Sequence, residues 1–279
     1  MSHFANEQSN SGISPADVPL ESAMPYPRLC AHRGFSAALP ENTMLSFGAA
    51  IALGAPEIEF DVRFTSDGVP VVCHDDRIDR IADGEGLVNE HTLDEIERLD
   101  AGSKFSPVFA GVTIPTFEEV LAKFSRHAII NLHLKSLHGP YPADKLETIV
   151  GLLDRYGQLD HVYLMGAPDV MKTALEVAPE IPRCMGAGLP GRKLEETAWE
   201  IVDRAIEWQC RKVQLFKPYF DEKMIARAHE NGILCNFFWS DDPAEAKKLY
   251  QLGIDTILTN DYLKISPVWK RFSKTGQNV

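Results

Sequence analysis

Short apolar runs alternate with segments of helical period along most of this chain. The runs are rich in Val, Ile, Leu and Phe, which is typical of buried strands. We expect strands at residues 28–32, 57–63, 69–75, 128–135, 161–167, 182–187, 212–216, 233–239 and 255–259. Between them, apolar side chains recur at the spacing of one helix face. We expect helices at residues 44–53, 92–99, 117–124, 143–156, 168–177, 195–208, 221–231 and 244–253.

This alternation of strands with helices predicts parallel βαβ units. About eight such units in a chain of 279 residues fit a closed barrel. We therefore predict an α/β fold, a single (βα)8 TIM barrel spanning residues 28–270. The polar stretch 77–111 is a short insertion after the second strand that lies over a pocket. Residues 1–27 are expected to form a flexible N-terminal lead-in.

The composition and charge of the chain limit the kinds of partner that it is expected to bind. The formal net charge of -12 argues against nucleic acid as a partner and against electrostatic docking to anionic membranes. No apolar run approaches the about 20 residues of a transmembrane helix, so we expect no stable membrane insertion. The five cysteines form no CxxC pair, and the N-terminus has no signal-peptide pattern. These features predict a cytoplasmic protein with reduced cysteines, and they leave the oligomeric state open.

Two acids and two histidines form the candidate site. Glu59 and Asp61 share one face of a strand because side chains alternate along it. Two carboxylates buried side by side repel each other, and a divalent cation such as Mg²⁺, Ca²⁺ or Mn²⁺ removes that cost. Salt bridges to Arg63 or Arg77 are the alternative. His32 and His74 flank the acids in the sequence and suit acid–base catalysis, because imidazole titrates near neutrality.

Barrel geometry brings these residues together. Active sites of such barrels lie at the carboxyl ends of the strands. His32 is expected to end the first strand, Glu59 and Asp61 the second, and His133 and Lys135 the third. We expect all of them to converge on one rim.

Four ordered motifs then resemble the glycerophosphodiester phosphodiesterase family. They are HRG from His32, PENT from Pro40, ExD from Glu59, and TxDGxxVxxHD from Thr65 to Asp75. The likeness continues through LDAGSKFSP, IPTFEEVL and DPAEAKKLYQLGIDTILTN, and it covers about residues 28–261. The order and spacing of the set make it specific, whereas HRG alone would be weak.

The resemblance implies a metal-dependent hydrolase. Such an enzyme cleaves a small-molecule glycerophosphodiester to sn-glycerol 3-phosphate and an alcohol, with one divalent ion as cofactor. By the motif positions, His32 and His74 correspond to the general base and acid, and Glu59 and Asp61 to metal ligands. The remaining implied site residues bind substrate: Arg33 and Lys135 at the phosphate, and Phe238 at the glycerol carbons.

One position departs from the family pattern. The third metal ligand of the family lies in a strand of the form NxExK, where this chain has Asn131, His133 and Lys135. If His133 is a ligand, the softer site favours Mn²⁺, Co²⁺ or Zn²⁺ over Mg²⁺ and Ca²⁺. If it is not, two carboxylates and water hold the ion. The departure keeps two alternative functions open: a lysophospholipase D-type enzyme acting on lipid head groups, or a non-catalytic barrel that binds a phosphorylated ligand.

Overall fold

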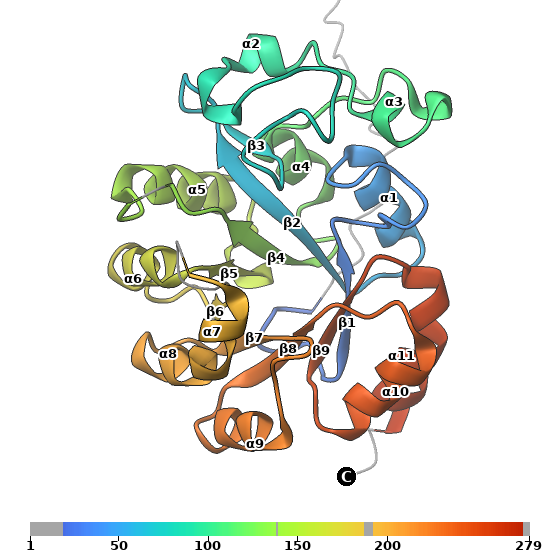
Figure 1. Cartoon of the computed structure of the whole chain (residues 1–279), viewed down its shortest axis with the longest axis vertical. Helices are drawn as coiled ribbons and strands as arrows, with labels where there is room; N and C mark the ends of the chain where they lie inside the picture. The colour runs from blue at the N-terminus through green and yellow to red at the C-terminus, as the bar shows by residue number, and fades with distance from the viewer. Residues whose placement is uncertain (1–18, 138, 187–191, 276–279) are drawn as a thin grey trace, which may run out of the picture.

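A closed barrel forms the centre of the molecule. The computed structural model describes residues 19–137, 139–186 and 192–275, and within them eight parallel strands pair side by side until the first meets the second. They are β1 (Arg28–His32), β2 (Glu57–Phe64), β4 (Ile129–Leu134), β5 (Val162–Gly166), β6 (Arg183–Met185), β7 (Lys212–Phe216), β8 (Leu234–Phe238) and β9 (Thr256–Thr259). The predicted TIM barrel is confirmed (Figure 1).

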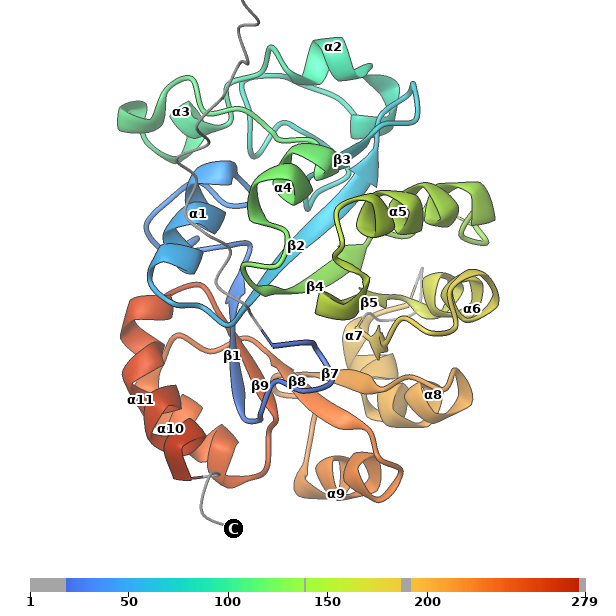
Figure 2. The ribbon, with the colours of Figure 1, turned by 180° about the vertical axis from the view of Figure 1, so that it is seen from behind.

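Helices surround the strands on the outside, as both views show (Figures 1 and 2). They are α1 (Met44–Ala52), α4 (Phe117–Phe124), α5 (Ala143–Arg155), α6 (Pro168–Val177), α7 (Leu194–Thr197), α8 (Ile201–Glu207), α9 (Glu222–Glu230), α10 (Pro243–Gln251) and α11 (Tyr262–Thr275), with short 3-10 turns at Leu159–His161 and Ala198–Glu200. The main apolar core lies between the two layers. Burial of an apolar face against the strands stabilises such helices more than their own propensity does.

Three expectations about these elements need correction. The predicted helix 195–208 is divided into α7, a 3-10 turn and α8, because the Arg204 guanidinium takes the carbonyl of Thr197 that a continuous helix would use. Glu59 and Asp61 do not end β2, since the strand continues to Phe64 to pair with β3. The periodicity of the sequence also did not predict α11, which packs against β1 and α10.

The insertion after β2 forms a small layer of its own at one end of the barrel (Figure 1). It contains β3 (Pro70–Val72), which is antiparallel to β2, and the short helices α2 (Leu93–Ile96) and α3 (Gly102–Phe105), with 3-10 turns at Val88–Glu90 and Pro107–Phe109. A separate apolar cluster that includes Ile78, Ile96 and Ile114 holds it together. The insertion is therefore a folded element and not a loose loop.

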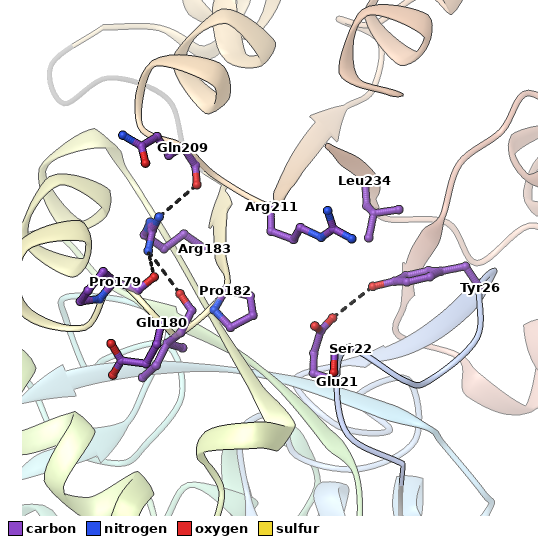
Figure 3. A pocket seen from close by; sticks show the side chains of 11 residues that line it. Glu21, Ser22, Tyr26, Pro179, Glu180, Pro182, Arg183, Gln209, Arg211 and Leu234 are labelled. Atoms are coloured by element: carbon purple, nitrogen blue, oxygen red, sulfur yellow. Dashed lines mark hydrogen bonds between the residues drawn. The ribbon is translucent and has the colours of Figure 1, made fainter. Parts of the chain in front are cut away.

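The opposite end of the barrel is closed by residues 19–27. The Glu21 carboxylate lies 2.9 Å from both the Arg28 guanidinium and the Lys212 ammonium, and all three side chains are buried. A polar pocket of about 290 Å³ lies beside them, with Glu21 and Tyr26 across from Arg183 (Figure 3). This packing differs from the flexible lead-in expected for residues 1–27, of which 1–18 lie outside the described residues.

Two further sequence expectations concern burial and the membrane. All five cysteines are buried and carry free thiols, as expected for core residues. Among the described residues, no helix combines the length and the apolar character needed to cross a bilayer.

Candidate active site

A cavity of about 250 Å³ lies among the predicted site residues, at the carboxyl end of the barrel. Residues of β1, β2 and β4, with those that closely follow β1 and β3, make one side of its wall polar, with His32, Arg33, Glu59, Asp61, His74 and His133. The rest of the wall is mostly apolar, with Met165, Gly186, Leu194, Phe216 and Phe238, and includes Gln214. The Lys135 ammonium reaches the same place, 2.7 Å from Asp61 Oδ1. The structure thus brings every predicted site residue to one location.

The two acids lie on the inner face of β2, and each is 1% exposed. Glu59 Oε2 accepts the backbone N–H of Arg33 at 3.1 Å, and Asp61 Oδ2 accepts the Asn42 amide at 2.9 Å. Burial and the neighbouring Asp61 charge raise the pKa of Glu59. Burial opposes ionisation of Asp61 as well, but Lys135, His133 and His74 together outweigh it and hold the pKa of Asp61 well below its usual range. Glu59 is therefore the acid whose ionisation most needs an added cation.

The predicted alternative, salt bridges from Arg63 or Arg77 to these acids, is not what the structure shows. Arg63 donates to the backbone carbonyl of His74, and Arg77 pairs with Asp79. A different arginine, Arg33, does form an ion pair with Asp61, with Nε 3.5 Å from Oδ2.

His133 completes a set of possible metal ligands. Its Nδ1 lies 3.1 Å from Asp61 Oδ1 and 3.9 Å from Glu59 Oε1. One ligand atom from each of the three residues lies within 4.8 Å of the others. Burial and the Lys135 charge lower the pKa of His133 to about 3, so its ring is neutral and keeps a lone pair. Two carboxylates and one imidazole suit Mn²⁺ or Zn²⁺ and accommodate Mg²⁺, so the residues present fit a divalent ion.

Lys135 already shows that this position attracts a cation. Its Nζ lies 2.9 Å from His133 Nδ1 and 2.7 Å from Asp61 Oδ1. Both of these atoms present lone pairs, and Asp61 Oδ1 accepts no well-directed hydrogen bond. The ammonium supplies positive charge that offsets the repulsion between two such lone pairs.

His32 is oriented by a neutral partner. Its Nδ1 lies 2.7 Å from Asn260 Oδ1, and the Asn260 amide N–H₂ donates to Asp241 Oδ2 at 2.9 Å. Since Asp241 can only accept, the amide oxygen must face His32, and the network assigns the proton to Nδ1. Nε2 then carries the lone pair, 3.8 Å from Glu59 Oε2. Burial and the nearby Arg33 charge lower the pKa of His32 to about 4.

His74 is oriented by a charged partner. Its Nδ1 lies 2.6 Å from Asp75 Oδ1, and the other carboxylate oxygen of Asp75 lies 2.5 Å from Arg80 Nε. Partial burial opposes ionisation of Asp75, but Arg80 and His74 outweigh it and hold the pKa of Asp75 at about 2. Burial, together with the Lys135 and Arg33 charges, lowers the pKa of His74 below 6.5, although Asp61 and the hydrogen bond to Asp75 act in the opposite direction.

The turn after β1 aims Arg33 into the cavity. Arg33 and Gly34 both have positive φ, at 54° and 80°. A Cβ on Gly34 would lie 2.6 Å from the backbone of Ser46, so only glycine fits there. Ser46 and Thr43 form the capping box of α1 and fix the end of the turn. The Arg33 guanidinium donates to Glu41 at 2.9 Å, so this acid supports the arginine from beside the cavity.

Sequence patterns did not predict several residues that orient the site. Asn260, Asp241 and Arg80 each contact a predicted catalytic side chain or its partner. Asn260 directly follows β9, so the rule that polar residues at strand ends point to the site could have found it. Lys217, which directly follows β7, pairs with Glu245.

Comparisons with known proteins agree with this geometry. The model of the glycerophosphoryl diester phosphodiesterase family matches residues 32–264. A glycerophosphodiester phosphodiesterase of Caldanaerobacter subterraneus subsp. tengcongensis is 32% identical over 83% of this chain and 93% of its own. The solved structure of an Oleispira antarctica phosphodiesterase in complex with the product sn-glycerol-3-phosphate superposes with a TM-score of 0.76 at 28% identity, over 87% of this chain and 96% of that one.

A third likeness supports the fold alone. The glycerophosphodiester phosphodiesterase of Agrobacterium tumefaciens superposes with a TM-score of 0.70 at 24% identity, over 85% of this chain and 98% of that one. Taken with the match over residues 32–264, these findings show that the chain belongs to the glycerophosphoryl diester phosphodiesterase family and is a phosphoric diester hydrolase.

Proposed function

We propose that this chain hydrolyses glycerophosphodiesters to sn-glycerol 3-phosphate and an alcohol, using one divalent cation and two histidines. One observation carries the proposal. His32 and His74 line the same cavity as Glu59 and Asp61, and one histidine is hydrogen-bonded to a neutral amide whereas the other is hydrogen-bonded to a carboxylate. The product bound to the Oleispira antarctica relative supports the choice of product.

The partners of the two histidines assign their roles. His32 is held by a neutral amide and has a pKa of about 4, so it is unprotonated at neutral pH and can take a proton at Nε2. His74 is held by a carboxylate, which stabilises the imidazolium that a general acid requires. The negative charge of a bound phosphodiester acts in the same direction on His74. We therefore assign His32 as the base and His74 as the acid.

The phosphate is expected to bind between these rings. Glu59, Asp61 and His133 would hold the divalent ion, which when bound supplies Lewis acidity at a phosphate oxygen. Arg33 and Lys135 add fixed positive charge where the transition state gathers negative charge. His32 removes the proton of the attacking oxygen, and His74 gives a proton to the leaving alkoxide.

The apolar wall suits the carbon part of the substrate. Phe238 packs edge-on against the His32 ring, with 5.2 Å between ring centroids, and against Phe216 at 5.7 Å. Together with Met165 these rings form a surface that can contact the glycerol carbons. Contact with Phe238 would place the glycerol moiety beside the proposed base.

A panel of metals tests the proposal. Chelated protein is given glycerophosphocholine or glycerophosphoethanolamine with Ca²⁺, Mg²⁺, Mn²⁺, Co²⁺ or Zn²⁺, and release of glycerol 3-phosphate is followed. We expect metal-dependent release that His74→Ala lowers by about 10²–10⁴-fold, the usual contribution of positioned proton transfer. Activity that survives both chelation and this substitution would refute the mechanism. Failure of every ion with every diester would favour a barrel that only binds phosphorylated ligands.

A further inference from the structure

Arg80 lies in the insertion, outside the barrel, yet it contacts two loops of the active site. Its Nε lies 2.5 Å from Asp75 Oδ2. Its two terminal nitrogens donate to Glu41 in a fork, with Nη2 2.7 Å from Oε1 and Nη1 3.1 Å from Oε2. Every donor group of the guanidinium thus faces a carboxylate, in the bidentate geometry that distinguishes arginine from lysine.

Each of these carboxylates also holds a proposed site residue. Asp75 accepts from His74 at 2.6 Å, and Glu41 accepts from Arg33 at 2.9 Å. The five side chains therefore form one hydrogen-bonded row, in which the carboxylates Asp75 and Glu41 alternate with His74, Arg80 and Arg33. Arg80 is the central member, and it joins the turn after β1 to the loop after β3.

The backbone beneath Arg80 is fixed. Ile78 and Ala82 on either side are fully buried in the small core of the insertion, and the N–H of Ala82 donates to the carbonyl of Ile78. The guanidinium is consequently presented from a rigid turn. An isolated surface ion pair contributes little, but here the fork belongs to a network of partly exposed side chains, from 48% exposed for Arg80 to 13% for Arg33.

We propose that Arg80 is a positioning residue. It fixes the distance between the proposed acid His74 and the phosphate-binding Arg33, which lie on either side of the scissile bond. The inference rests on the proposed function. It gives the insertion a role in catalysis, because the insertion supplies the residue that links the proton donor to the phosphate clamp. Arg80 itself touches no reacting atom.

The choice of leaving group separates this role from a merely structural one. An alkyl leaving group needs a proton from His74, whereas a p-nitrophenyl leaving group departs as a stable anion without one. We compare Arg80→Ala and Arg80→Lys on glycerophosphoethanolamine and on a p-nitrophenyl phosphodiester. Arg77→Ala is the matched control, because Arg77 lies on the same segment as Arg80. It forms its ion pair with the exposed Asp79, outside the hydrogen-bonded row that contains Arg80.

We expect Arg80→Ala to lower kcat on the alkyl diester by about 10–100-fold, the scale of a 1 Å misplacement. On the aryl diester we expect kcat to fall by less than about 3-fold, with KM raised because Arg33 is less well held. Arg80→Lys restores the charge without the fork and should fall in between, and it serves as the test if the alanine variant does not fold. Arg77→Ala should match the wild type.

Two results would overturn the inference. One is wild-type kinetics of Arg80→Ala on both substrates. The other is an equal loss of kcat on both, which would exclude an effect through His74. Failure of the proposed function has a different signature: His74→Ala would then retain the full rate on the alkyl diester, and the assignment of Arg80 would fall with that of His74.

Discussion

Asn260 offers a sharp test of how the proposed base is oriented. We consider Asn260→Ala, which removes the acceptor 2.7 Å from His32 Nδ1. The surrounding loop should persist, because Asp241 Oδ1 still accepts from Thr259 Oγ1 at 2.7 Å and from the backbone N–H groups of residues 260 and 261 at 2.8 and 3.1 Å. The substitution therefore releases the ring while leaving its backbone surroundings in place.

The size of the effect follows from this single bond. A neutral hydrogen bond contributes about 0.5–1.5 kcal/mol net, which corresponds to about 2- to 13-fold in the ratio of His32 rings with the proton on Nδ1 and the lone pair toward the cavity to all other arrangements. We expect kcat to fall by up to that factor with KM nearly unchanged. His32→Ala, which removes the base itself, should cost about 10²–10⁴-fold.

The assay is the release of glycerol 3-phosphate from glycerophosphoethanolamine at saturating substrate, with thermal unfolding measured on the same samples. Ser36→Ala is the matched control, because the Ser36 hydroxyl also contacts Asn260 Oδ1, at 3.2 Å, but does not touch the ring nitrogen. It should change kcat less than Asn260→Ala does. A wild-type kcat for Asn260→Ala, or a loss as large as that of His32→Ala, would refute the proposed orientation.

Three further predictions concern the metal, the substrate and stability. His133→Glu adds a carboxylate to the site and should tighten Mg²⁺ binding by about tenfold or more relative to Mn²⁺ in calorimetric titrations; an unchanged preference would exclude His133 as a ligand. Phe238→Ala should raise KM for glycerophosphodiesters by about 5- to 30-fold, for an apolar contact of about 1–2 kcal/mol, and an unchanged KM would remove the ring from the substrate site. Glu21→Gln leaves Arg28 and Lys212 short of a buried partner and should lower the free energy of unfolding by about 3–5 kcal/mol at pH 7. Burial opposes ionisation of Glu21, but Lys212 and Arg28 outweigh it and lower its pKa below 4.5. Its contribution is thus complete above pH 4.5 and is lost as the pH falls further, so urea titrations should show wild type and variant converging in acid.

Period-2 alternation accounts for what the sequence predicted well. Glu59 and Asp61 were expected on one face of a strand, and both point inward from β2. The same rule placed His133 beside them from β4, where it pairs in register with Asp61. Alternation is a property of any extended backbone, so it survives errors in the strand boundaries, such as the extension of β2 to Phe64.

The residues that orient the site could not be found in this way. Arg80 lies in a polar stretch without periodicity, where a charged side chain is usually solvated. Its partners, Glu41 and Asp75, become neighbours only when the insertion folds back over the first turn. Asp241 and Asn260 meet because two loops follow adjacent strands, β8 and β9. Such contacts depend on the packing of separate elements, which local patterns do not encode.

One divalent ion, held by Glu59, Asp61 and His133, is proposed to enable two histidines to exchange protons with the substrate. Titration of chelated protein with Mn²⁺, with bound metal and release of glycerol 3-phosphate measured on the same samples, tests this most directly. We predict that activity rises in proportion to bound metal and reaches its plateau at one ion per chain. The double variant Glu59→Gln, Asp61→Asn should bind no Mn²⁺ and should show no activity. Full activity of the metal-free protein, or tight binding of Mn²⁺ by the double variant, would contradict it.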